Sequence, residues 1–151
     1  KKKIKKVLDK FFEDDYIKNK YTYIITKPRT EFNEIVRLKQ LASIYIDVYS
    51  IDKYSTFALA SLESLASGNI VFSSLLNITE ETLKRMCIDV ETFPIINTGN
   101  TDEEFLDKLY DICCLSKSEL KNKMIESYKY YSRNMNKQKF YNEFEKKILN
   151  E

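Results

Sequence analysis

A helical segment with a single charged side chain is the first feature of this sequence that could do chemistry. In a chain where 32% of the residues are charged, residues 55–68 (STFALASLESLASG) carry one charge, on Glu63. A helix so rich in apolar and small residues is expected to be buried between a sheet and another layer. Glu63 is therefore the best-placed candidate for a functional residue in this segment.

A helical wheel places Glu63 at a boundary between two environments. Glu63 lies beside Leu59 at the edge of the apolar stripe, and Ser61 and Ser64 lie on the opposite side, which we expect to face solvent. The stripe itself consists of Ala58, Leu59, Leu62, Leu65 and Ala66. A carboxylate at such a boundary costs free energy unless donors hydrogen-bond to it. The donor is either a protein group or the hydroxyl groups of a bound ligand.

The amino end of the same helix offers a second kind of site. Ser55 and Thr56 are suitable caps, and the free backbone N–H groups of a first turn attract anions such as phosphate. A parallel strand at residues 44–49 would place this turn outside the carboxyl edge of the sheet, where α/β proteins bind ligands. Lys27 and Arg29 follow another strand-like run, and they either approach phosphate or serve as solvated loop residues.

The composition excludes several other chemistries. The chain has no histidine, which removes the commonest general base and the commonest metal ligand. Cys87, Cys113 and Cys114 lack zinc-ligand spacing. We therefore expect these cysteines to be reduced, as in a cytosolic protein, and to pack as small apolar side chains. Two glycines are too few for a glycine-rich phosphate loop. The net charge of +2 gives no general attraction to nucleic acid, and no apolar run approaches the roughly 20 residues of a membrane span.

Strand-like and helical patterns alternate over the first two thirds of the chain. This alternation predicts an α/β fold with parallel strands joined by helical crossovers, and the apolar strands indicate a sheet covered on both faces. Asp47, near the end of its strand, is either hydrogen-bonded to a loop or part of the site. The predicted strands are residues 21–26, 44–49, 69–73 and 93–97, and the predicted helices are residues 4–12, 31–42 with Thr30 as its cap, 55–67 ended by Gly68, and 79–86.

From Thr101 onward the pattern is helical only. Helices are predicted at residues 102–114, 116–133 and 136–149, with Ser116 and Ser118 as caps. The aromatic residues of this tail are expected to pack in the core; they are Tyr128, Tyr130, Tyr131, Phe140, Tyr141 and Phe144. No linker or repeat divides the chain, so we expect residues 1–151 to form a single domain.

The stretch from Leu41 to Ile46, followed by FALASLESLASGNIV at residues 57–71, resembles the carboxyl-terminal half of GT-B-fold glycosyltransferases of the group 1, or family 4, kind. A weaker similarity covers nearly the whole chain, including the turn from Asn97 to Asn100. The resemblance implies a Rossmann-like parallel sheet flanked by helices, with a helical carboxyl-terminal tail. It implies binding of a nucleotide diphosphate sugar as substrate, without a cofactor or metal, and a hexosyltransferase with a retaining outcome that serves polysaccharide biosynthesis.

The same resemblance assigns site residues. The family carries two glutamates separated by seven residues, and the second, which accepts hydrogen bonds from the ribose hydroxyls, matches Glu63. Thr56, Phe57 and Ala58 match the turn whose N–H groups meet the phosphate and the sugar. Residues 25–27, up to Lys27, would lie beside the base. The first glutamate is replaced by Ser55, and Asp52 is the nearest carboxylate, so the catalytic residues stay unassigned.

Several alternatives and partners follow from these assignments. The abrupt lysine start and the family's diphosphate-binding Arg/Lys pair, which lies upstream, predict a fragment of a longer two-domain enzyme that lacks its amino-terminal acceptor domain and is inactive alone. A glycosyltransferase-like binding or chaperone subunit is the main alternative, favoured by Ser55, and a flavodoxin- or receiver-like domain ranks last. We expect a cytoplasmic protein. The lysines at residues 1–6 either contact the inner face of the membrane or form a solvated helix surface.

Overall fold

The computed structural model describes residues 2–27, 29–49, 59–75, 78–85 and 92–134. The predicted helix at residues 136–149 and the proposed phosphate turn at residues 55–58 lie outside these ranges. Nearly all the other predicted elements fall within them and can be compared directly.

Three short parallel strands form the sheet of the described residues, in the order β1-β2-β3. They are β1 (Ile44–Ile46), β2 (Ile70–Ser73) and β3 (Ile96–Asn97). The register aligns Ile44 of β1 with Ile70 of β2. These strands confirm the predicted α/β class and the parallel direction, in a smaller sheet than the four strands predicted from the sequence.

The predicted strand at residues 21–26 is wrong, because these residues form no regular strand. Tyr21 and Tyr23 pack against the core instead, and the Tyr21 hydroxyl donates to the Cys113 carbonyl at 3.2 Å. Ile24 is 68% exposed. A strand needs a neighbouring backbone for its hydrogen bonds, and within the described residues none pairs with this run. Composition alone therefore predicts a strand to which the described residues offer no pairing partner.

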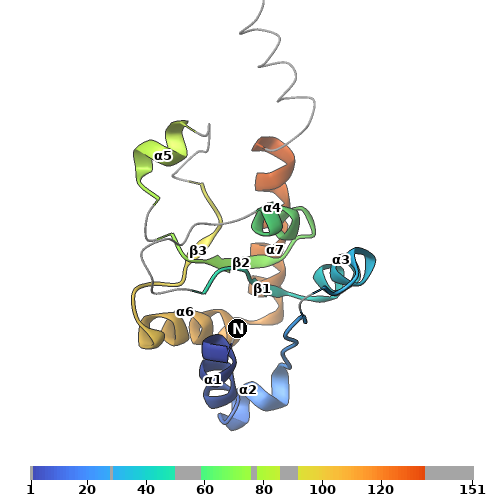
Figure 1. The fold of residues 1–151 in the computed structure, drawn as a ribbon, viewed down its shortest axis with the longest axis vertical. Helices are drawn as coiled ribbons and strands as arrows, with labels where there is room; N and C mark the ends of the chain where they lie inside the picture. Colours follow the sequence, from blue (N-terminus) through green and yellow to red (C-terminus); the bar gives the residue numbers. More distant parts are fainter. Residues whose placement is uncertain (1, 28, 50–58, 76–77, 86–91, 135–151) are drawn as a thin grey trace, which may run out of the picture.

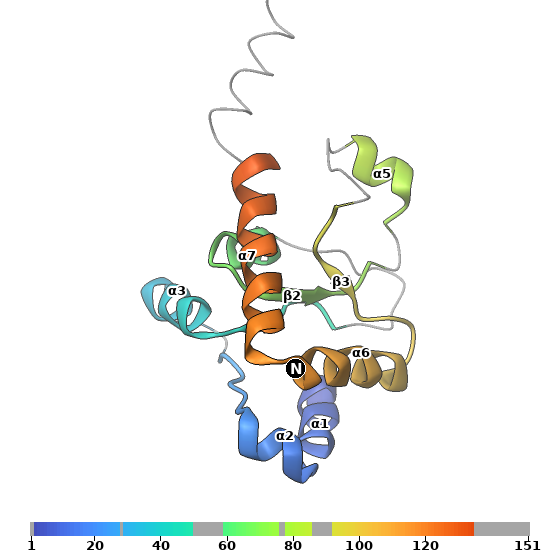
Figure 2. The same cartoon turned by 180° about the vertical axis from the view of Figure 1, so that it is seen from behind.

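Helices connect and cover the strands (Figures 1 and 2). Helix α4 (Leu59–Ala66) joins β1 to β2, and α5 (Glu80–Arg85) lies between β2 and β3. In both views α1 (Lys2–Phe11), α2 (Asp15–Lys20) and α6 (Asp102–Cys114) lie on one side of the sheet. Helix α7 (Lys117–Asn134) packs against α4 and β2.

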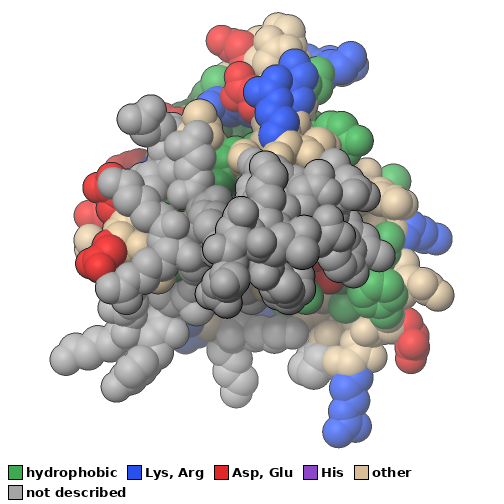
Figure 3. Space-filling view, turned by 90° about the horizontal axis from the view of Figure 1, so that it is seen from above, with side chains coloured by type: hydrophobic (Ala, Val, Ile, Leu, Met, Phe, Trp, Pro, Cys, Tyr) green, Lys and Arg blue, Asp and Glu red, His purple; other side chains and the backbone are tan. Residues whose placement is uncertain are grey.

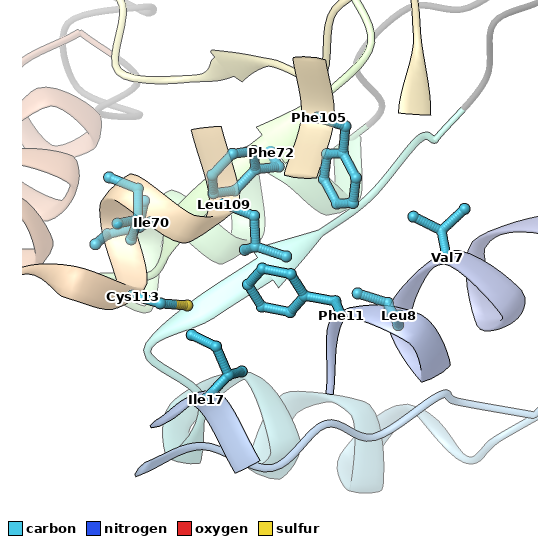
Figure 4. Close-up of a cluster of buried hydrophobic side chains, with 10 residues drawn as sticks. Val7, Leu8, Phe11, Ile17, Ile70, Phe72, Phe105, Leu109 and Cys113 are labelled. Carbon is cyan, nitrogen blue, oxygen red and sulfur yellow. The ribbon is translucent and has the colours of Figure 1, made fainter. Parts of the chain in front are cut away.

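Two hydrophobic clusters occupy the two faces of the sheet, because successive residues of a strand point to opposite sides. Ile70 and Phe72 contribute to one face and Val71 to the other. The α6 core (Figure 4) contains the buried residues Val7, Leu8, Phe11, Ile17, Ile70, Phe72, Phe105, Leu109, Ile112 and Cys113. The α4 core contains the buried residues Leu65, Val71, Leu83, Ile95 and Tyr130. The sheet is thus covered on both faces, as the apolar strands predicted.

Hydrogen bonds at the helix ends explain several boundaries. Ser116 caps α7, since its Oγ accepts from the Glu119 N–H at 3.3 Å and the Glu119 carboxylate accepts from the Ser116 N–H at 2.8 Å. Thr30 does not cap the next helix as predicted, because its hydroxyl donates to the Lys27 carbonyl at 2.8 Å. Helix α2, absent from the sequence prediction, starts where Asp14 accepts from the Ile17 N–H at 3.1 Å.

Helix α3 (Phe32–Leu41) lies at the β1 edge of the sheet, apart from the other helices (Figure 1). Its end residues Phe32 and Leu41 are 66% and 73% exposed. The one residue that α3 buries is Lys39, at 3% exposure. A helix that exposes its apolar ends and buries a lysine is unusual, because an unpaired lysine is costly to bury. The buried Lys39 ammonium therefore requires a hydrogen-bonding or ionic partner.

Charged side chains of both signs lie on the surface, as the near-neutral charge of the chain predicts. Figure 3 shows both acidic and basic side chains around the margin of one face. Tyr130 is buried and Tyr131 packs beside it in the α4 core, whereas Tyr128 is 54% exposed. Among the residues described, none of the helices combines the length and the apolar character that a membrane span requires.

Candidate functional site

Helix α4 is fixed at its carboxyl end by a Schellman motif. The Asn69 N–H donates to the Ser64 carbonyl at 3.0 Å, and the Gly68 N–H donates to the Leu65 carbonyl at 2.9 Å. Gly68 has a φ of 79°, which a glycine adopts without strain. The predicted stop at Gly68 is confirmed, and the motif leads directly into β2.

The buried face of α4 agrees only in part with the predicted one. Leu65 of the predicted apolar stripe is fully buried and Leu62 packs against the α4 core. Ser61 and Ser64 are fully buried as well, however, whereas Leu59 is 71% exposed. Helix α4 packs against α7 and β2, and the Ser61 hydroxyl is hydrogen-bonded to Asp47. The Ser64 hydroxyl is satisfied within the helix, by donating to the Ala60 carbonyl at 2.7 Å. The serine face is therefore a packing surface, and its prediction as a solvated side is wrong.

Asp47 ties β1 to the first turn of α4. The Ser61 hydroxyl donates to Asp47 Oδ2 at 2.5 Å, and the Asp47 N–H donates to the Phe72 carbonyl at 2.9 Å. The Asp47 carboxylate thus accepts a hydrogen bond from a residue of helix α4. This contact holds the amino end of α4 at the carboxyl edge of the sheet, one half-turn before Glu63.

Glu63 receives its hydrogen bond from Lys39. The Lys39 ammonium lies 2.8 Å from Glu63 Oε2 and 3.0 Å from the Ala60 carbonyl. The two side chains differ greatly in exposure, at 3% for Lys39 and 42% for Glu63. The protein therefore supplies one donor to the boundary carboxylate, while a large part of that side chain still faces outward.

Tyr45 completes this group of side chains, which we call the Lys39–Glu63 cluster: Lys39, Tyr45, Asp47, Ser61 and Glu63. The Lys39 ammonium lies 5.0 Å from the centroid of the Tyr45 ring, within the range of a cation–π interaction. Burial, helped by the Asp47 and Glu63 carboxylates, raises the pKa of Tyr45 to about 12. The hydroxyl of Tyr45 is thus neutral at every physiological pH.

The pKa of Tyr45 predicts a loss of stability in base. The folded state keeps Tyr45 protonated up to about pH 12, whereas the unfolded chain ionises near 10. The contribution of Tyr45 is therefore complete below pH 10 and is lost as the pH rises toward 12. Urea unfolding across this range is expected to show a shallower decline for Tyr45→Phe than for the wild type. An equally steep decline in Tyr45→Phe would contradict this, and Tyr128→Phe, at an exposed tyrosine, is the control.

A second group of polar residues follows β3 at the same edge of the sheet. Asn97 Oδ1 accepts from the Leu75 N–H and from the Gly99 N–H, both at 3.1 Å. Glu104 accepts from the Asn100 N–H at 2.7 Å, next to the start of α6. The amino end of α6 is thus occupied by its own carboxylates, which makes it a poor site for a phosphate.

The sequence-predicted site residues fall into three groups. Glu63 is described, half-exposed and bound to Lys39. Lys27 is exposed between α2 and α3, and no hydrogen bond or ion pair joins it to Glu63, so its place beside the base stays a prediction. The remaining predicted residues lie outside the described ranges: Ser55, Thr56, Phe57 and Ala58.

Three members of the cluster are not assigned to the site by sequence reasoning: Lys39, Tyr45 and Ser61, which the wheel places on the solvent-facing side. With 25 lysines and arginines in the chain, no pattern singled out Lys39. The signal available was indirect, because a lone carboxylate on an otherwise uncharged helix requires a donor. No group of three or more acidic or cysteine side chains that could hold a metal ion occurs in the described part of the chain.

Comparison with family models, with curated proteins and with solved structures gives no match for this chain. A function can therefore be inferred from the residues of the cluster, from the strands and helices that position them, and from the resemblance within residues 41–71.

Proposed function

We propose that this chain is the donor-binding domain of a glycosyltransferase that takes up a nucleotide diphosphate sugar, with Glu63 accepting hydrogen bonds from the ribose hydroxyls. The observation that carries the proposal is the position and partial exposure of the Glu63 carboxylate. Its carboxylate lies one turn into the helix that follows β1, is held at one oxygen by Lys39, and stays 42% exposed. An ionised carboxylate accepts several hydrogen bonds, so a vicinal diol is a suitable ligand.

The position of Glu63 supports the same ligand. Parallel α/β sheets bind ligands outside the carboxyl ends of their strands, and the Asp47–Ser61 contact keeps the amino end of α4 at that edge. In the transfer itself, the bond from the anomeric carbon to the diphosphate breaks and a bond to the oxygen of an acceptor hydroxyl forms. The nucleoside diphosphate leaves with the electron pair of the broken bond, and the proton of the acceptor hydroxyl passes to it.

Groups outside these residues are needed for the transfer, because the acceptor and the diphosphate charge must be held together with the donor. We propose that the domain belongs to a longer cytoplasmic glycosyltransferase whose amino-terminal part binds the acceptor. Exposed apolar residues at the β1 edge of the sheet support a larger protein. Within the described residues α3 lies at this edge and no further strand pairs with it. The exposed apolar residues Phe32 and Leu41 of α3 lie at the same side.

Binding of nucleotide diphosphate sugars tests the proposal. Titration calorimetry with UDP-, GDP- and ADP-sugars is expected to give binding for at least one nucleotide. Glu63→Gln keeps the shape of the side chain and removes its charge, so we expect a loss of affinity of about tenfold or more. Glu126→Gln, at an exposed glutamate on α7, is the matched control and should bind like the wild type. Equal affinity for Glu63→Gln and wild type would refute the role of Glu63.

A non-catalytic binding or chaperone subunit is the second candidate, and the presence of Ser55 where the family has a glutamate favours it. The two candidates differ in turnover. If the longer protein binds a nucleotide sugar but releases no nucleoside diphosphate in the presence of acceptor mixtures, the non-catalytic candidate is correct.

A further inference from the structure

We propose that Lys39 is a positioning residue that orients the Glu63 carboxylate toward the diol of the bound nucleotide and so sets the preference for a ribose. This inference rests on the proposed function. It names a residue that neither the motif in residues 57–71 nor the composition of the chain indicates. Lys39 does not itself contact the ligand in this account.

The surroundings of Lys39 are specific to a lysine. Its side chain is 3% exposed, and its ammonium has three partners: Glu63 Oε2 at 2.8 Å, the Ala60 carbonyl at 3.0 Å and the centroid of the Tyr45 ring at 5.0 Å. A buried ammonium persists only where such partners replace water. Three elements, α3, α4 and β1, therefore meet at this one charged atom.

The backbone of Lys39 is held as well. The Asn69 side-chain amide donates to the Lys39 carbonyl at 2.8 Å and to the Ala42 carbonyl at 2.5 Å. Asn69 is fully buried and directly precedes β2. The end of α3 is thus fixed to the start of the central strand, and the Lys39 side chain extends from a fixed point toward Glu63.

This arrangement restricts the conformation of Glu63 before any ligand arrives. A free glutamate side chain loses rotamer freedom when a ligand orders it, and that loss weakens binding. Lys39 holds Oε2 and leaves Oε1, with two acceptor lone pairs, for ligand hydroxyls. Without Lys39 the carboxylate is free to turn, so its hydrogen bonds to a diol should weaken, while contacts to the rest of the nucleotide remain.

The test compares a ribonucleotide with its 2′,3′-dideoxy analogue. With UDP and 2′,3′-dideoxy-UDP as probes, or the pair for whichever base binds, the wild type is expected to prefer the ribonucleotide by about tenfold or more. In Lys39→Met the preference should fall to within about threefold of unity, with affinity for the dideoxy analogue unchanged. Arg37→Met, at an exposed position on the same helix, is the control and should keep the wild-type preference.

The outcomes separate the inference from the proposed function. If the wild type binds neither nucleotide of any base, the proposed function fails and the inference fails with it. If the wild type prefers the ribonucleotide and folded Lys39→Met does so equally, the proposed function stands and the inference is wrong. Should Lys39→Met not fold, as judged by its amide spectrum, Lys39→Arg keeps the charge but displaces the donor. An unchanged preference in Lys39→Arg overturns the inference, and a reduced preference in a folded protein supports it.

Discussion

Phe105→Ala is expected to lower the free energy of unfolding by about 3–5 kcal/mol, the range observed when a buried aromatic residue is truncated. Phe105 on α6 is fully buried. Its ring lies 5.9 Å from that of Phe72 in an edge-to-face arrangement and 4.9 Å from that of Tyr49. The truncation would therefore leave a cavity where α6 meets the central strand (Figure 4).

Urea unfolding followed by circular dichroism measures this effect. Phe32→Ala is the matched control, because Phe32 on α3 is 66% exposed and its truncation should change stability little. If Phe105→Ala unfolds at the same urea concentration as the wild type, the α6 core does not stabilise the sheet as described.

Glu63→Leu is expected to lower the free energy of unfolding by about 1–3 kcal/mol, because it leaves the buried Lys39 ammonium without its counter-charge. This range lies below that of a fully buried pair because the Glu63 side chain is 42% exposed. Lys39→Met in the Glu63→Leu background should restore most of the loss, since an apolar pair then fills the same space. The resulting double-mutant cycle measures the coupling between the two residues.

An exposed ion pair provides the comparison. Lys5 and Asp9 are 2.6 Å apart on α1, but their side chains are 59% and 45% exposed. Lys5→Met should have little measurable effect on stability, because solvent screens such a pair. Additive effects of Glu63→Leu and Lys39→Met would contradict the Lys39–Glu63 cluster, since they would show that the two residues do not interact.

The alternation of helices and strands could be read from the sequence because local patterns determine it. Helix α6 occupies the predicted residues, since acidic residues follow its Thr101 cap and its apolar residues repeat at helical spacing. Gly68 ends α4 as predicted, because the motif there needs a residue with positive φ. Such features depend on residues within a few positions of one another.

The failed predictions depend on partners distant in sequence. Residues 21–26 have the composition of a strand but no described neighbour to pair with. The wheel of α4 places the serines in solvent, whereas Ser61 and Ser64 are fully buried with their hydroxyls bonded to Asp47 and to the Ala60 carbonyl. The position of α3 at the edge of the sheet determines which of the 25 basic residues contacts Glu63. No local sequence pattern contains that information.

The sequence predicts that Glu63 needs a hydrogen-bond donor, and the structure shows Lys39 in that role. The sequence left a protein donor and a ligand as alternatives, and Lys39 provides the protein donor at Oε2. The exposed part of the side chain is where the ligand is proposed to bind. The two alternatives are therefore compatible in this protein.

Amide chemical-shift mapping during titration with nucleotide diphosphate sugars would show whether a donor binds at Glu63. We predict saturable shifts for one nucleotide base, largest at Glu63 and its neighbours in α4 and extending to Lys39 through the ion pair. The shifts should be lost in Glu63→Gln. An unchanged spectrum around Glu63 with UDP-, GDP- and ADP-sugars alike would contradict the account of this chain as a donor-binding domain.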